Sequence, residues 1–166
     1  MGFALAIFYF YFCQPTLKSL CLGAALALSG VILRAWASGH LYKNQRIATS
    51  GPYASTRNPL YVGSFIIGLG FCVIAGNYTV AAIFIPLFAA VYIPVMLQET
   101  KHLRTLFGQE YSQYEAEVPL FFPRLTPFRR SGDHFSFRQY LANREYEALL
   151  GYLGALAILL LKMGLS

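Results

Sequence analysis

The stretch "NPLYVGSFIIGLGFCVIAGNYTVAAIFIPLFAAVYIPVMLQE", residues 58–99, decides the fold because two long apolar runs flank a very short link. The runs, residues 59–75 and 78–97, are each about long enough to cross a hydrocarbon core of roughly 30 Å as a helix. Only "GNY", residues 76–78, joins them. We therefore predict two membrane helices in a tight antiparallel hairpin.

Further apolar runs lie on both sides of this hairpin. Residues 16–42 and 148–166 are again about long enough to span the bilayer, whereas residues 2–13 would reach only about 18 Å as a helix. The first run lacks a basic start and a small-residue cleavage site, so we expect it to stay in the mature protein. With 57% hydrophobic and 12% charged residues, the chain is predicted to be all-α, a polytopic membrane helix bundle of about five membrane helices in a single domain over residues 1–166.

The net charge of +6 is concentrated in two regions. Residues 40–57 and 101–144 carry most of the lysines and arginines. If the crossings alternate, both regions lie on one side of the membrane, and the positive-inside rule makes that side cytoplasmic. The charge therefore predicts an orientation rather than a nucleic-acid partner, and we expect an integral membrane protein in contact with membrane lipids.

The character of the chain changes after residue 97, in "QETKHLRTLFGQEYSQYEAEVPLFFPRLTPF". Apolar and aromatic residues recur at three- and four-residue steps among charges, which predicts a cytoplasmic amphipathic helix over residues 99–117, with Gly108 as a weak point. The proline-rich residues 118–128 predict an extended segment that folds back as a lid. Residues 124–147 then connect to the last membrane helix.

Cysteine and histidine give no metal-binding pattern. The three cysteines lie within apolar runs and the three histidines are scattered, without the spacing of a ligand set. We expect no metal site.

Two charged residues near helix ends are candidates for function. Arg34 lies about two turns inside the end of its apolar run, where an arginine needs an anionic partner or must extend to the interface. Glu99 stands where the fourth span leaves the membrane. It is either a helix-end carboxylate among basic neighbours or an anionic group for a cationic ligand or a ribose. Spacing alone does not separate these interpretations.

The start of the 59–75 helix carries a second set of polar groups. Asn58 is expected to cap the helix with its side chain, and Pro59 suits the first helical position. Capping alone explains both residues. The same helix start, however, presents free N–H groups and a positive dipole end that can receive a carboxylate. Tyr53 and Tyr61 flank it, and could also be ordinary interfacial aromatics.

Two motifs resemble those of the isoprenylcysteine carboxyl methyltransferase family of membrane enzymes. The stretch "LRAWASGHLYKNQRIATSGPYASTRNPLYVGSF" is similar to the family's "GPY…RHPxYxG" signature, and "QETKHLRTLFGQEYSQYEAEVPLFFP" is similar to its "EE…L…FGxEYxxY…VP…P" signature. The resemblance covers residues 33–123. It implies S-adenosylmethionine as methyl donor, S-adenosylhomocysteine as product and a lipophilic acceptor from the bilayer.

Carried over by motif position, the resemblance implies a set of site residues. Arg34 would lie near the reacting centre and orient the acceptor. The residues implied to bind the cofactor are His40, Ile47, Ala48, Tyr53, Asn58, Pro59, Leu60, Tyr61 and Glu99. Methyl transfer to a carboxylate or thiolate needs little acid–base chemistry, so alignment and exclusion of water would be the main contributions of the protein.

The chain departs from the family pattern at three positions. Asn58 replaces the histidine of "RHP", Thr100 replaces the second glutamate of "EE", and Val95 stands where eukaryotic members have a substrate-binding arginine. These departures favour a bacterial inner-membrane relative, with its site facing the cytoplasm and an acceptor other than a prenylated protein. The alternatives are phospholipid or amine N-methylation, an NADPH-dependent sterol-reductase-like enzyme, and a non-catalytic membrane scaffold. The oligomeric state stays open.

Overall fold

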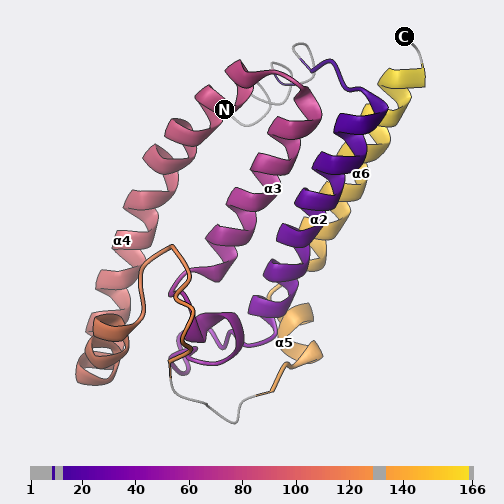
Figure 1. Cartoon of the computed structure of the whole chain (residues 1–166). Coiled ribbons are helices and arrows are strands. Elements are labelled where there is room, and N and C mark those ends of the chain that lie inside the picture. The colour runs from indigo at the N-terminus through magenta and orange to yellow at the C-terminus, as the bar shows by residue number, and fades with distance from the viewer. Residues whose placement is uncertain (1–8, 10–12, 129–133, 165–166) are drawn as a thin grey trace.

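The computed structural model describes residue 9, residues 13–128 and residues 134–164. Over this part of the chain all the regular structure is helical, which confirms the all-α prediction (Figure 1). The elements are α2 (Leu17–Ser38), η1 (Gly51–Ala54), α3 (Pro59–Ala75), α4 (Tyr78–Glu117), α5 (Phe137–Ala142) and α6 (Tyr146–Gly164).

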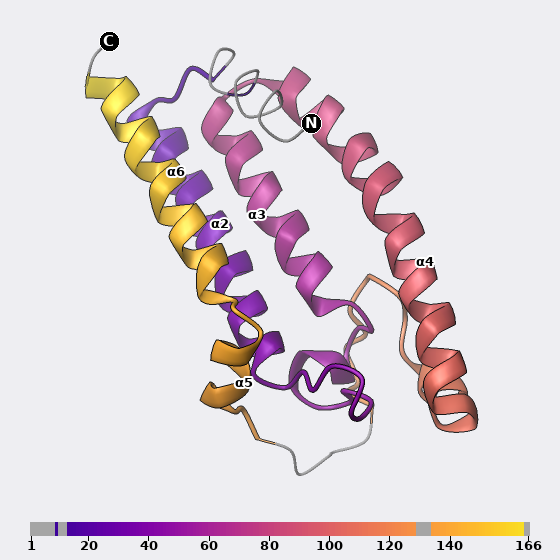
Figure 2. The same ribbon diagram turned by 180° about the vertical axis from the view of Figure 1, so that it is seen from behind.

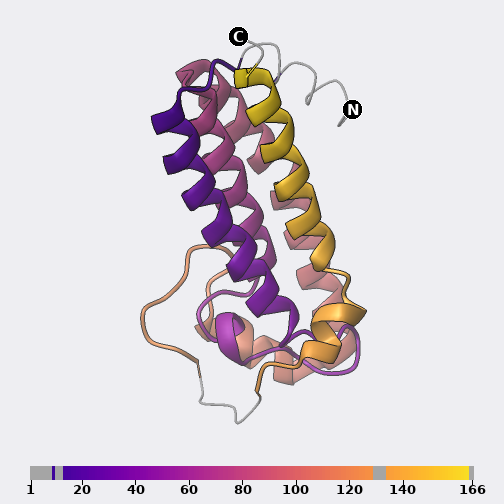
Figure 3. The same cartoon turned by 90° about the vertical axis from the view of Figure 1, so that its right-hand side faces the viewer.

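Four of these helices run side by side along the length of the molecule. α2 and α3 form the centre, α6 lies against α2, and α4 lies on the outer side of α3 (Figures 1 and 2). The turn between α3 and α4 lies at the same end as the last turns of α6, whereas η1 and α5 lie at the opposite end (Figure 3). The two ends of the bundle therefore differ in chemistry, and the charged loops gather at the η1 end.

The helices are apolar enough for a membrane protein. α2, α4 and α6 are each long and apolar enough to cross a bilayer, and α3, with 17 residues, is a shorter apolar helix. Of the expected first run, residues 2–13, the structure describes only Tyr9 and Cys13, so whether that run spans lies outside the described residues.

The predicted hairpin is confirmed. α3 ends at Ala75, α4 begins at Tyr78, and Gly76 between them adopts the left-handed conformation (φ 64°) that ends a helix most easily when no side chain is present. The Asn77 side chain caps the start of α4 by accepting a hydrogen bond from the Thr79 N–H at 2.9 Å. The chain therefore reverses direction within two residues.

Glycines bring α2 and α3 together. A Cβ added to Gly23 would lie 2.4 Å from the Gly70 carbonyl oxygen, and one added to Gly63 would lie 2.8 Å from that of Gly30. Small residues allow such close backbone approach between membrane helices, and dispersion contacts then hold the pair together. We call Gly23, Gly30, Gly63 and Gly70 the glycine seam.

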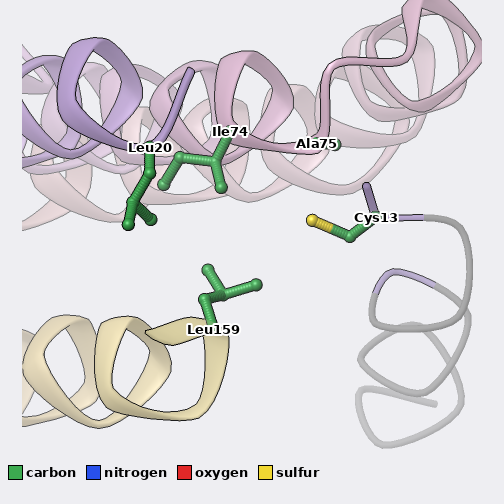
Figure 4. Packing of buried hydrophobic residues seen from close by; sticks show 5 residues of the cluster. All are labelled: Cys13, Leu20, Ile74, Ala75 and Leu159. Atoms are coloured by element: carbon green, nitrogen blue, oxygen red, sulfur yellow. The ribbon is translucent and has the colours of Figure 1, made fainter. Parts of the chain in front are cut away.

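A buried apolar cluster closes the end of the bundle away from η1 (Figure 4). Cys13, Leu20, Ile74, Ala75 and Leu159 pack together there, with Cys13, Ile74 and Leu159 fully buried. Because these residues come from four separate segments, the cluster fixes α6 and the chain before α2 against the α2–α3 pair.

The predicted amphipathic segment is helical but does not form a separate helix. Residues 99–117 continue α4, which runs for 40 residues and breaks only at Gly108 (φ 54°, ψ −124°). Those angles are open to glycine, which has no Cβ to clash. After the break, Tyr111 and Tyr114 become buried. A position of this segment on the membrane surface stays a prediction.

The proline-rich segment folds back onto the η1 loop, as predicted. The Arg57 N–H donates to the Pro119 carbonyl at 3.0 Å, and the Arg124 and Phe128 N–H groups donate to Ser55 and Ala54 at 2.9 and 2.8 Å. These bonds fix the backbone just before α3. The segment therefore supports the start of α3 from behind.

Candidate functional site

A cavity of about 420 Å³ lies at the η1 end of the bundle. Its walls come from the end of α2 and the loop after it, η1, the start of α3, the middle of α4 and the start of α6. Its volume is within the range of small-molecule and cofactor pockets.

Most of the residues implied by the family motifs meet in this cavity. It is lined by Arg34, Ile47, Ala48, Tyr53, Asn58, Leu60, Tyr61 and Glu99. His40 and Pro59 are not among its lining residues. The structure thus brings residues from four segments of the sequence to one place.

The two remaining residues lie behind the wall. His40 is buried, with its Nδ1 2.9 Å from the Ser50 hydroxyl and its ring packed on Gly51, where an added Cβ would come within 2.7 Å. Pro59 is the fully buried first residue of α3. Both residues position the loop and the helix start, and a direct contact of either with a cofactor stays a prediction.

Asn58 precedes α3 as predicted, but the expected side-chain cap is wrong. Its Nδ2 donates to the Leu120 carbonyl at 3.0 Å, and no side-chain hydrogen bond caps the helix. The folded-back segment supplies a carbonyl that wins the amide, which local sequence does not reveal. The start of α3 consequently has no side-chain oxygen of its own on its first N–H groups, and its positive dipole end stays available to an anion.

Tyr61 and Glu99 face each other across the cavity wall. The Tyr61 hydroxyl donates to Glu99 Oε1 at 3.0 Å, and the Tyr61 ring lies 5.2 Å from that of Tyr92. In the part of the chain that the structure describes, Glu99 takes part in no ion pair. It therefore offers a negative charge to a cationic ligand group.

Arg34 has an internal anionic partner that the sequence did not indicate. Its Nε and Nη2 donate to the two carboxylate oxygens of Glu145 at 3.0 and 2.7 Å. Its Nη1 donates to the Leu60 carbonyl at 3.2 Å and to the Ser64 hydroxyl. Glu145 also lines the cavity and is 9% exposed. The only sequence signal for it was a lone carboxylate just before the last span.

Arg57 is a second wall residue that sequence reasoning did not include. Its guanidinium pairs with Glu115, which also accepts from Arg104 Nε at 2.6 Å. These hydrogen bonds, first that from Arg104 and then that from Arg57, hold the pKa of the Glu115 carboxyl below its usual range. Arg57 Nε is buried and has no hydrogen-bond partner, unlike every other buried side-chain nitrogen or oxygen among the described residues.

Tyr53 lines the cavity from η1. Its ring is almost completely buried, and burial raises the pKa of the phenol, so the hydroxyl stays protonated at all physiological pH values. Its backbone carbonyl accepts from the Tyr114 hydroxyl at 2.8 Å. The residue is a fixed, neutral part of the wall.

A family model described as phospholipid methyltransferase matches residues 19–110, more than half of the chain. The chain belongs to this family. The match covers α2, η1, α3 and most of α4, and thus most of the cavity wall. The relationship to the isoprenylcysteine carboxyl methyltransferases is also confirmed, because one of the relatives below carries that activity in its name.

Three curated relatives of this phospholipid methyltransferase family member carry different names. The nickel-cobalt-cadmium resistance protein NccN of Alcaligenes xylosoxydans xylosoxydans is 33% identical over 74% of this chain and 58% of its own length. The cobalt-zinc-cadmium resistance protein CzcN of Cupriavidus metallidurans is 36% identical over 70% and 53%. The protein-S-isoprenylcysteine O-methyltransferase of Schizosaccharomyces pombe is 31% identical over 60% and 44%.

The chain thus spans little more than half the length of the first two relatives. No solved structure matches it. Among the described residues, no group of three or more histidine, cysteine, aspartate and glutamate side chains could hold a metal ion.

Proposed function

We propose that this membrane methyltransferase family member transfers a methyl group from S-adenosylmethionine to a lipophilic small acceptor, a carboxylate or a thiol. The observation that carries the proposal is that Glu99, Tyr61 and the uncapped start of α3 meet in one cavity of cofactor size. The cavity would face the cytoplasm of a bacterial cell from the inner membrane, because it lies at the basic end of the bundle.

The residues of the cavity suit the amino acid part of this cofactor. Glu99 would pair with its ammonium group, and the free N–H groups at the start of α3 would receive its carboxylate. The buried, unpartnered Nε of Arg57 adds positive charge behind the same wall. The apolar side chains of Ile47, Ala48 and Leu60 would cover the adenosine.

When bound, the cofactor supplies an electrophilic methyl group on a sulfonium. The contribution of the chain is to hold the acceptor in line with that group and to keep water out, an effect of several kcal/mol. Apolar helices surround the cavity, and exposed Trp36, Ile93 and Leu97 cover the outer faces of α2 and α4. A lipophilic acceptor could therefore reach the cavity from the bilayer.

A second candidate is N-methylation of a phospholipid or another amine. The family description favours it, and Glu99 could take up a proton from the amine. An NADPH-dependent reductase and a non-catalytic scaffold remain readable outcomes of the experiment below.

The test is calorimetry of the detergent-purified protein with S-adenosylhomocysteine and, separately, with NADPH. We expect S-adenosylhomocysteine to bind and NADPH not to bind. Glu99→Ala and Tyr61→Ala should each weaken binding by about tenfold or more, since each leaves a buried polar partner unpaired.

Glu110→Ala is the matched control, because Glu110 is an exposed carboxylate of α4 outside the cavity. Absence of S-adenosylhomocysteine binding by folded protein would refute the proposal. Transfer of a labelled methyl group into a total membrane lipid extract would then identify the acceptor and separate the O-, S- and N-methylation candidates.

A further inference from the structure

The pairing of Arg34 with Glu145 determines which acceptors the cavity can take. Both residues line the cavity. Because Glu145 occupies two nitrogens of the guanidinium, and Leu60 and Ser64 occupy the third, Arg34 has no free edge for a second carboxylate. Its charge is also neutralised where it stands.

The last part of the described chain is built to deliver Glu145 to this position. The Asn143 side chain donates to the Ser38 and Leu41 carbonyls, both at 3.0 Å, and the Ser136 N–H donates to the Gly39 carbonyl at 2.9 Å. These bonds fix α5 on the end of α2. Arg144 then adopts a positive φ of 56°, an uncommon conformation for a residue with a side chain, and turns the chain so that Glu145 faces Arg34.

Glu145 comes from outside the part of the chain that the family model matches. That match ends at residue 110, whereas Arg34 lies inside it. The arginine is thus part of the shared wall, and its carboxylate partner is supplied by the segment that follows. A carboxylate acceptor next to Arg34 would meet the negative charge of Glu145, and Glu99 adds a second negative charge to the same cavity.

We propose that Glu145 is a specificity-determining residue that acts through Arg34 and makes the cavity select an acceptor that is uncharged at neutral pH, a lipophilic thiol, over a lipophilic carboxylate. This inference rests on the proposed function and narrows its acceptor. In the transfer, a sulfur lone pair of the acceptor forms the bond to the methyl carbon. The bond from that carbon to the sulfonium breaks and leaves its electron pair on the sulfonium sulfur, and the thiol proton passes to water.

The test compares two probes of equal chain length, hexadecanethiol and hexadecanoic acid, in detergent micelles under reducing conditions at neutral pH. Binding of each probe is measured as thermal stabilisation of the S-adenosylhomocysteine-bound protein, and methyl transfer with labelled cofactor is measured alongside. We expect the acid to need about tenfold more probe than the thiol for equal stabilisation, because like charges brought together at a binding site are costly.

Two variants separate the charge of Glu145 from its hydrogen bonds. In Glu145→Gln, which keeps an oxygen for Arg34 but loses the charge, the acid should bind as well as the thiol or better. In Glu145→Asp, which keeps the charge, the preference for the thiol should remain. If Glu145→Gln does not fold, the wild-type and Glu145→Asp preferences decide the question.

Equal or better binding of the acid by the wild type would overturn the inference, as would an unchanged preference in Glu145→Gln. These results are distinguishable from failure of the proposed function. Loss of S-adenosylhomocysteine binding by the wild type would refute the methyltransferase proposal itself, whereas intact binding without discrimination between the probes would refute only the role of Glu145.

Discussion

At the scale of single residues, Glu115 shows how a carboxylate outside the cavity shapes its wall. It accepts hydrogen bonds from Arg57, which lines the cavity, and from Arg104 on the same helix. The pair with Arg57 is largely buried, with side chains 11% and 16% exposed. Removing the carboxylate would leave a buried guanidinium without its anion, which is more costly than the pair is stabilising.

We predict that Glu115→Gln lowers the stability of the detergent-solubilised protein by about 1–3 kcal/mol at neutral pH. Because the folded-state pKa of Glu115 is lowered, its contribution is fully present above the unfolded value of about 4.3 and is lost as the pH falls through the folded value. The difference between wild type and variant should therefore be constant from about pH 8 to pH 5 and shrink below about pH 4.

Thermal denaturation across this pH range measures the effect. Glu110→Gln is the control, because Glu110 is exposed and takes part in no ion pair among the described residues. A stability difference that did not shrink at low pH would contradict the assignment of the effect to the carboxylate charge.

At the scale of helices, the glycine seam sets how the site is framed. The α2 backbone carries Arg34 and the α3 backbone carries Leu60 and Ser64, which accept from that arginine. Close contact of the two helices at Gly30 and Gly63 lies about one turn from these hydrogen bonds. Separation of the helices would break them.

We predict that Gly70→Ala destabilises the protein by about 1–3 kcal/mol, because the added Cβ would lie 2.6 Å from both the Ala27 nitrogen and the Gly23 carbonyl oxygen. Gly154→Ala, in α6, has nothing within 4 Å of the new Cβ and should leave stability unchanged or slightly raised. Thermal unfolding in one detergent compares the two, and equal losses would argue against a close-packed seam.

Helix positions were predictable from the sequence where signals are local. Pro59 and Gly76 mark the two ends of α3, and the apolar run between them needs no tertiary information. The length of α4 was harder to predict, because the charged residues after residue 97 change the polarity of the helix without ending it. Only Gly108 interrupts it, and a glycine can also be tolerated within a helix.

The site was predictable only as far as the motifs reach. Family motifs gathered the residues around Tyr61 and Glu99, which the structure places in hydrogen-bond contact. The partner of Arg34 lies 111 residues away in sequence, and no spacing rule connects them. The side chain of Asn58 was assigned to the wrong acceptor because a local cap and a distant carbonyl compete, and only the fold decides between them.

At the scale of the whole molecule, the two ends of the bundle predict an orientation in the membrane. Tyr78, at the α3–α4 turn, is 95% exposed, and Leu125, in the folded-back segment near the cavity, is 100% exposed. The basic residues lie at the second end, so that end should face the cytoplasm.

We predict that a Cys21→Ser protein carrying Tyr78→Cys reacts with a membrane-impermeant maleimide in intact spheroplasts. The same background carrying Leu125→Cys should react only after permeabilisation. The native Cys13 and Cys72 are buried and should contribute little background. Labelling in the opposite order would reverse the orientation and place the cavity outside the cytoplasm.

The ion pair between Arg34 and Glu145 also has a consequence for biosynthesis. α2 enters the membrane with an arginine whose carboxylate partner is still 111 residues from being made. At typical rates of synthesis this interval is about 5–20 s, during which the α3 groups Leu60 and Ser64 are the first of its partners to emerge. Assembly of the cavity must therefore wait for α5 and α6, so a ribosome that stalls before Glu145 would leave a membrane-inserted chain with an uncompensated charge, a form that quality-control proteases could distinguish from the finished protein.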